Sequence, residues 1–203
     1  MRATSALRII GGALAGRRLS SPRGERTRPT SSRAREGLFG WLGPLEKSTR
    51  VLDLFAGTGS LGLEALSRGA QHALFVERDP AALRCLRQNV RDLDLGSRAT
   101  LIDSEAVRAV RRMAYQERRF DLILADPPYE SAPELSALPL HALLSPGGAL
   151  VVERRSRRRG PSGAAHEICG LHRIESRSYG QTAFDWYAHG PELDPEAEQE
   201  EIR

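Results

Sequence analysis

The chain has 203 residues, of which 40% are hydrophobic and 28% are charged, an ordinary composition for one globular domain with a sizeable core. Its net charge is +4 and its isoelectric point is about 9.6, which favours a negatively charged partner. The apolar runs are no longer than a strand, residues 1–8 lack the apolar core of a signal peptide, and the two cysteines form no CxxC pattern. We therefore expect a cytoplasmic protein without a membrane span, a disulfide or a metal site.

The first 45 residues are expected to form a small extension. Two short extended runs, 7–10 and 18–20, surround several glycines and predict a hairpin with a wide turn. A helix is predicted from Ser31 to Leu42, because Thr30 or Ser31 can cap it and Gly43 can end it. Since this segment precedes the first predicted sheet strand, we expect that it is not needed to complete the fold that follows.

From Val51 onward, strand and helix patterns alternate. The expected strands cover residues 51–55, 73–77, 99–102, 120–125 and 149–153, and the expected helices cover residues 60–67, 80–93, 104–115 and 133–144. Repeated units of this kind predict an α/β fold, with a mostly parallel, doubly wound sheet and helices on both faces.

The end of the chain departs from this alternation. Residues 173–179 and 182–188 are two extended runs around Gly180 and Gln181, with no helix between them. They predict a terminal hairpin with one strand antiparallel to the rest of the sheet. Residues 191–203 contain six acids and one base, which indicates a disordered tail. The expected organisation is thus an extension at 1–45, a cofactor-binding domain at 46–190 and a tail at 191–203.

A glycine-rich turn follows the first predicted sheet strand. Gly57, Gly59 and Gly62 match the GxGxxG fingerprint, in which glycines let the backbone approach a cofactor closely. A nicotinamide-dependent oxidoreductase has this fingerprint too, with an acid such as Glu77 at the expected spacing. Two features favour S-adenosylmethionine instead. Asp53 precedes the loop and can bind the cofactor's cationic amino group, and the chain offers no candidate residues for hydride transfer.

The residues expected to bind the cofactor come from this turn and from the ends of the next two strands. Glu77 can accept hydrogen bonds from the ribose hydroxyls, and Asp103 with Ser104 can meet the adenine amine, although Glu77 and Asp103 could also be ordinary polar strand ends. The full expected set is Asp53, Phe55, Ala56, Gly57, Thr58, Gly59, Glu77, Asp103 and Ser104.

A second motif follows the strand at 120–125. The tetrapeptide Asp126-Pro127-Pro128-Tyr129 ends that strand, because proline has no N–H and a fixed φ. The Asp126 carboxylate and the Pro127 carbonyl can accept both N–H bonds of an exocyclic amine, and Tyr129 can stack on a base taken out of its helix. A surface Asp-Pro-Pro turn is common by itself, but at the end of this strand it predicts a methyl-acceptor site.

Together these motifs resemble the bacterial 16S rRNA guanine-N2 methyltransferase D family. The resemblance spans residues 7–188 and includes Tyr179-Gly180-x-Thr182; its most specific parts are the glycines at 11–12 and the Arg-Pro-Thr segment at 28–30 with Arg33 and Arg35. It implies a Rossmann-like class I methyltransferase with a reversed last strand. It also implies methylation of a guanine N2 in 16S rRNA, within the small ribosomal subunit or an assembly intermediate.

Basic clusters indicate where RNA would bind. Residues 1–35 contain nine arginines against one acid, and residues 154–159 contain five arginines. A one-sided basic stretch is typical of phosphate-backbone binding, although a solvated face has the same composition. The expected RNA contacts are Arg17, Arg18, Arg28, Arg33 and Arg35. Two other functions remain open: a DNA adenine-N6 methyltransferase, which uses the same tetrapeptide, and a non-catalytic rRNA-binding assembly factor. A protein glutamine methyltransferase is less favoured, because that chemistry goes with Asn-Pro-Pro-Tyr.

Overall fold

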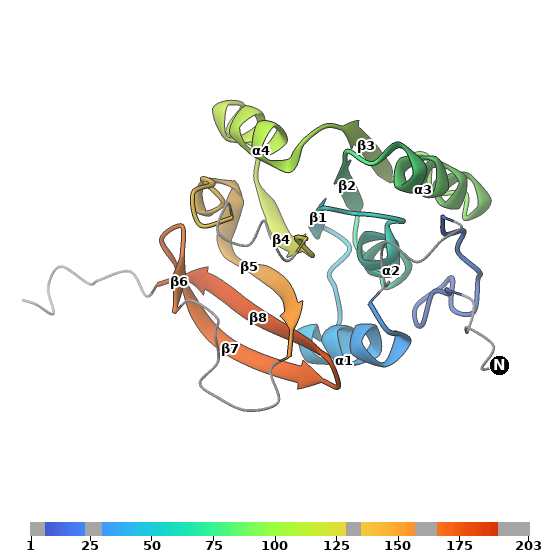
Figure 1. The fold of residues 1–203 in the computed structure, drawn as a ribbon, viewed down its shortest axis with the longest axis horizontal. Coiled ribbons are helices and arrows are strands. Elements are labelled where there is room, and N and C mark those ends of the chain that lie inside the picture. The colour runs from blue at the N-terminus through green and yellow to red at the C-terminus, as the bar shows by residue number, and fades with distance from the viewer. Residues whose placement is uncertain (1–6, 23–29, 129–134, 157–165, 191–203) are drawn as a thin grey trace, which may run out of the picture.

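One sheet of eight strands runs through the protein. The computed structural model describes residues 7–22, 30–128, 135–156 and 166–190, and within them the strand order is β3-β2-β1-β4-β5-β8-β7-β6 (Figure 1). The strands are β1 (Arg50–Leu54), β2 (His72–Glu77), β3 (Ala99–Asp103), β4 (Phe120–Ala125), β5 (Leu144–Arg155), β6 (Glu167–Ile168), β7 (Leu171–Tyr179) and β8 (Thr182–His189). Strands β1 to β5 pair in parallel, whereas β8 pairs antiparallel with both β5 and β7.

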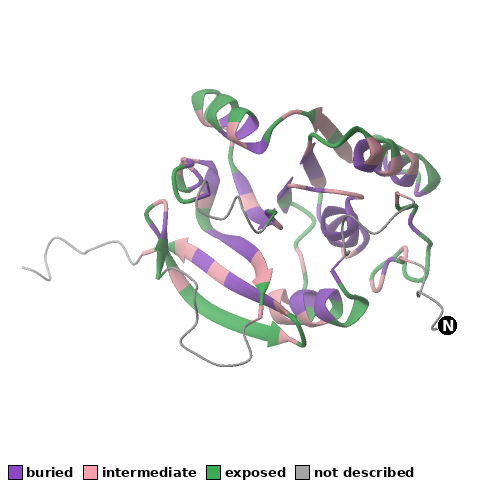
Figure 2. Cartoon of the chain, viewed as in Figure 1, coloured by how far each residue is buried: buried purple, intermediate pink, exposed green. Residues whose placement is uncertain are grey.

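Helices cover both faces of this sheet. Within the described residues they are α1 (Ser32–Leu42), α2 (Ser60–Ser67), α3 (Pro80–Asp92) and α4 (Ala106–Tyr115), with a short 3-10 turn η1 (His141–Leu143). Apolar side chains of α1, α2 and α3 form one core cluster with the sheet, and those of α4 and η1 form the other. None of the described helices is long and apolar enough to cross a bilayer. Figure 2 shows buried residues concentrated in the central strands and an exposed outer strand β7.

The predicted fold class is confirmed by this topology. The strand at 120–125 and the helix at 60–67 have their predicted bounds, and the reversed terminal strand is β8. Ser31 caps α1 as expected, since its side chain accepts a hydrogen bond from the N–H of Ala34 at 3.2 Å.

Two parts of the secondary structure differ from the prediction. In the described part of the expected helix at 133–144, only Leu135 and the turn η1 are helical, because Pro139 lacks an N–H and disfavours helical geometry before it. Strand β5 begins at Leu144, five residues earlier than expected. The short strand β6 was not predicted. It pairs with β7 through a tight turn in which Cys169 and Gly170 have φ values of 54° and 75°, and cysteine is an unusual residue for that conformation.

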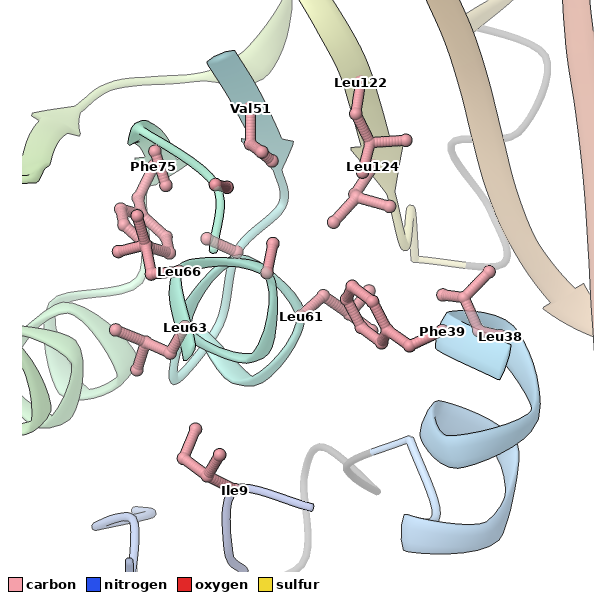
Figure 3. Close-up of a cluster of buried hydrophobic side chains, with 14 of the residues drawn as sticks. Ile9, Leu38, Phe39, Val51, Leu61, Leu63, Leu66, Phe75, Leu122 and Leu124 are labelled. Atoms are coloured by element: carbon pink, nitrogen blue, oxygen red, sulfur yellow. The ribbon is translucent and has the colours of Figure 1, made fainter. Parts of the chain in front are cut away.

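The N-terminal segment is part of the core, contrary to the expectation that the fold could be completed without it. Ile9 and Leu19 are 1% and 6% exposed and belong to the same cluster as β1 and α2. Figure 3 shows Ile9 beside α2, and Leu38 and Phe39 of α1 in the same cluster as Leu61 and Leu124. A single antiparallel bridge joins Arg8 to Arg18, which confirms the hairpin. The predicted boundary near residue 45 therefore does not separate two cores.

The packing of Ile9 gives a stability prediction. Ile9→Ala removes a fully buried side chain and should lower the free energy of unfolding by about 2–5 kcal/mol. The matched control is Ile174→Ala, because Ile174 is 60% exposed and its truncation should change stability by less than about 0.5 kcal/mol. Chemical denaturation of both variants measures the difference. Equal effects in the two variants would contradict the docking of the N-terminal segment.

Candidate active site

The carboxyl ends of β1 to β4 bring the predicted site residues together. These strands lie side by side and parallel, so the residues that end them share one edge of the sheet. Glu77 pairs in register with Asp103, and Asp53 lies between Phe75 of β2 and Leu124 of β4. Asp126 directly follows β4 at the same edge.

The glycine-rich turn at residues 55–59 has an unusual backbone. Gly57 and Gly59 have φ values of 56° and 81°, and Phe55 has a φ of 59°. A bulky residue with positive φ is strained, and such strain concentrates at ligand-binding sites. The turn is held by hydrogen bonds from Ala56 N–H to the carbonyl of Val76 (3.0 Å) and from Gly59 N–H to the carbonyl of Ala56 (2.7 Å). These hydrogen bonds thus fix the backbone of the turn in one conformation.

Asp53 lies beneath this turn with its side chain buried. Its Oδ2 accepts a hydrogen bond from the N–H of Gly62 at 2.8 Å. The pKa of Asp53 is raised to about 7, mainly by burial and also by the nearby carboxylates of Asp126 and Glu77, against the lowering effect of the Gly62 hydrogen bond. A cationic group placed beside Asp53 would favour its ionised form.

Glu77 organises the turn from the other side. Its Oε2 accepts from the N–H of Gly57 at 2.7 Å, and its Oε1 accepts from the N–H groups of Arg78 (2.8 Å) and Asp79 (2.7 Å). A carboxylate has about four acceptor positions, so acceptor capacity remains for a ligand. The ribose contact stays a prediction.

The expected adenine contacts lie at the end of β3. Asp103 is exposed and lies 3.7 Å from the guanidinium of Arg87. The N–H of Ser104 donates to the carbonyl of Glu77 at 3.1 Å, which ties the two strand ends together. Among the described residues, no three His, Cys, Asp or Glu side chains gather into a metal site.

The Asp-Pro-Pro corner stands next to this turn. Asp126 is half-buried, Pro127 is buried and Pro128 is exposed, while Tyr129 lies outside the described residues. Burial raises the pKa of Asp126 to about 6. The N–H of Asp126 donates a long hydrogen bond (3.5 Å) to the carbonyl of Leu54 at the end of β1. The predicted amine acceptor and the glycine-rich turn are therefore neighbours.

The predicted RNA contacts do not all share one environment. Arg17, Arg18 and Arg33 are exposed, and the guanidinium of Arg17 also donates to the carbonyl of Asp92. Arg28 lies outside the described residues. Arg35 is a correction: its side chain is completely buried between α1 and the core, so it cannot reach a phosphate from the surface.

Two residues of this region were missed in the sequence. Asn89 is buried in α3, where its Nδ2 donates to the carbonyls of Ser20 (3.1 Å) and Thr58 (3.0 Å), so it connects the N-terminal segment to the glycine-rich turn. Glu153 lies near the end of β5 and accepts from the hydroxyl of Thr30 at 2.5 Å. The available signal was an acid that directly follows an apolar strand, as at Asp126.

The chain is similar to a protein family, to named relatives and to solved structures. The family model described as "Conserved hypothetical protein 95" matches residues 7–188. Ribosomal RNA small subunit methyltransferase D of Escherichia coli K12 is 41% identical over 123 residues, or 61% of this chain and 60% of that protein. The protein of the same name from Haemophilus influenzae is 34% identical over 150 residues, or 72% of this chain and 78% of that protein. A solved structure of a hypothetical protein from Thermus thermophilus is 33% identical, covers 88% of this chain and 97% of that chain, and has a TM-score of 0.72.

The close packing around Gly62 gives a prediction for the glycine-rich turn. A Cβ at Gly62 would lie 2.4 Å from Phe75 and 2.9 Å from Asp53 Oδ2, so Gly62→Ala should destabilise the fold by about 1–3 kcal/mol and weaken S-adenosylhomocysteine binding. Gly40→Ala is the matched control, because a Cβ there meets no atom within 4 Å on helix α1. Calorimetric titration and thermal unfolding measure both effects. Unchanged ligand affinity in Gly62→Ala would contradict the assigned role of the turn.

Proposed function

The chain belongs to the family described as conserved hypothetical protein 95, and from this membership we propose that it transfers a methyl group from S-adenosylmethionine to the N2 amine of a guanine in 16S rRNA. The resemblance to the 16S rRNA methyltransferase D family, predicted from the motifs, is confirmed by the relatives of that name. The observation that carries the proposed reaction is the position of Asp126, at the strand edge shared with Asp53 and the glycine-rich turn.

The residues at this edge fit S-adenosylmethionine. The turn at 55–59 leaves open space at Gly57, where an added Cβ would meet no atom within 4 Å. The buried carboxyl of Asp53 is suited to the cationic amino group, and the remaining acceptor capacity of Glu77 is suited to ribose hydroxyls. When bound, the cofactor supplies a methyl group on a sulfonium sulfur, and the protein has to bring an amine to it.

Asp126 acts on that amine. The lone pair of an aryl amine is delocalised into the ring, so the amine is a poor nucleophile. Acceptors at Asp126 and at the Pro127 carbonyl would hold both N–H bonds and favour a pyramidal nitrogen with an exposed lone pair. Positive charge develops on nitrogen during the transfer, so a fixed carboxylate binds the transition state better than the ground state. With its pKa raised to about 6, Asp126 is mostly ionised above pH 7. Tyr129 is proposed to stack on the base.

The substrate separates this proposal from its rivals. We propose that the methyl acceptor is 16S rRNA within the small subunit or an assembly intermediate. A DNA adenine methyltransferase would instead methylate duplex DNA, and a non-catalytic assembly factor would transfer no methyl group. The test incubates the protein and methyl-labelled S-adenosylmethionine with small subunits, free 16S rRNA or duplex DNA. Label in N2-methylguanine of 16S rRNA supports the proposal. Label only in DNA adenine, or binding without transfer, contradicts it.

Replacement of Asp126 tests the mechanism. Asp126→Ala should lower turnover by roughly 10²-fold or more, because it removes one preorganised electrostatic interaction with the transition state. S-adenosylhomocysteine binding, measured by calorimetry, should stay close to the wild-type value and serves as the folding control. Near-wild-type turnover in this variant would rule out the proposed role.

The exposed arginines provide a separate test of RNA binding. Arg18→Ala combined with Arg33→Ala should weaken RNA binding and lower the log–log salt slope by about 0.7 to 0.9 for each phosphate that the variant no longer neutralises. The matched control is Arg111→Ala with Arg112→Ala, two exposed arginines of α4 on the other face of the sheet. Affinity is measured at several salt concentrations. An equal weakening in the control pair would show that the charge total matters more than the N-terminal surface.

A further inference from the structure

Glu153 lies beside Asp126 at the edge of the sheet. Strands β4 and β5 are parallel, and Ala125 pairs in register with Val152. Asp126 and Glu153 each follow one of these paired residues, so they stand level on adjacent strands. Side chains at equal positions of parallel strands point to the same face, and the two carboxyl groups repel each other electrostatically.

Two threonines hold the Glu153 carboxyl in place. The hydroxyl of Thr30 donates to Glu153 Oε2 at 2.5 Å, and the side chain of Thr182 also hydrogen-bonds this carboxyl. Thr30 ends the Arg-Pro-Thr segment, and Thr182 ends the Tyr-Gly-x-Thr segment. Both are motifs of the family resemblance that the reaction proposed above does not use. In the folded chain, two segments about 150 residues apart meet at one carboxyl group.

Arg35 supplies the only positive charge that the described residues place close to this carboxyl within the core. Its side chain is 0% exposed, and its Nη1 lies 3.8 Å from Glu64 Oε2. None of its three side-chain nitrogens has a hydrogen-bond partner among the described residues. Burial lowers the pKa of Arg35, whereas attraction to Glu64 and Glu153 raises it. Its charge is thus shared electrostatically between these two carboxyls.

We propose that Glu153 is a positioning residue of the reaction. It forms a carboxyl pair with Asp126, and Thr30, Thr182 and Arg35 hold that pair so that it presents a single negative charge to the amine at neutral pH. This inference rests on the proposed function of Asp126, and it adds the group that controls the charge of Asp126.

The electrostatics of the site support such a pair. The pKa of Glu153 is raised to about 8, mainly by burial and also by the charge of Asp126, against the lowering effects of the two threonines and Arg35. Two close buried carboxyls lose their protons in two steps that belong to the pair. As pH rises through about 6 the pair gains its first charge, and through about 8 its second. Asp53 adds a third acid on the same face, whereas the neighbouring Arg154 is paired with Asp185 at 2.5 Å.

Replacement of Glu153 by its neutral isostere tests the inference. In the wild-type protein, the ¹³C signals of the Asp126 and Glu153 carboxyls should show the two titration steps of the pair, separate from the titration of Asp53 near pH 7, and turnover should change at both steps. In Glu153→Gln the step near pH 8 should vanish from both measurements, and Glu153→Asp should restore it. The matched control is Glu46→Gln, an exposed carboxylate that bonds only Ser48 among the described residues and should leave both steps in place.

A second variant separates this role from a merely structural one. Thr30→Val removes a donor to the charged form of Glu153, so the step near pH 8 should move up by about one pH unit. The proposal would be overturned if both titration steps persisted in Glu153→Gln, or if the step near pH 8 did not move in Thr30→Val. The NMR titration needs no RNA. A wild-type protein that shows both steps but methylates no RNA would instead contradict the proposed function and leave the carboxyl pair standing.

Discussion

The structure depends on one buried carboxylate, that of Glu64 in α2. It accepts hydrogen bonds from the N–H groups of Ile10 and Gly11, both at 2.7 Å, and from Arg68 Nε at 2.8 Å. The guanidinium of Arg35 in α1 lies 3.8 Å away. An unpaired buried charge costs several kcal/mol, so these partners are required once the side chain is inside. Through Glu64, the N-terminal hairpin, α1 and α2 are held to one another.

This connection means that the proposed RNA-binding segment and the glycine-rich turn cannot move independently. Ser67 at the end of α2 reinforces the attachment, because its Oγ accepts from Leu14 N–H and donates to the carbonyl of Gly11. Asn89 extends the same connection to the turn, since it bonds both Ser20 and Thr58. An exposed arginine such as Arg18 therefore belongs to a segment whose backbone is fixed relative to α2. An RNA that docks through its phosphates thus meets a site of fixed geometry, which favours transfer because orientation is set before the reaction.

The alternation of strands and helices could be predicted because its signal is local. Helix α2 begins after Gly59, and the apolar run 120–125 is followed by Asp126 and two prolines, so neighbouring residues show both the hydrophobic period and the residues that end each element. The acids at the strand ends could be predicted for the same reason, since parallel strands place their ends at one edge. Contacts between residues distant in sequence could not be predicted. Arg35 has the same local pattern as the exposed Arg33, and only the packing of α1 against Glu64 shows which of them is buried. The local signal at Glu153, an acid after an apolar strand, does not show that Glu153 lies beside Asp126, because that requires knowledge of which strand adjoins β4.

The same packing explains why the proposed active site lowers the stability of the fold. Asp53, Asp126 and Glu153 lie on one face of adjacent strands, and each has a raised pKa, mainly because it is buried. A carboxyl whose folded pKa lies above its unfolded value destabilises the fold as pH rises between the two values, and for Asp53, raised to about 7, the full cost is on the order of 4 kcal/mol. Near neutral pH the ionised carboxyls at this edge therefore destabilise the fold. A ligand with a cationic amino group beside Asp53 reduces that cost when it binds, so the destabilisation by Asp53 and the affinity for such a cofactor have the same electrostatic origin.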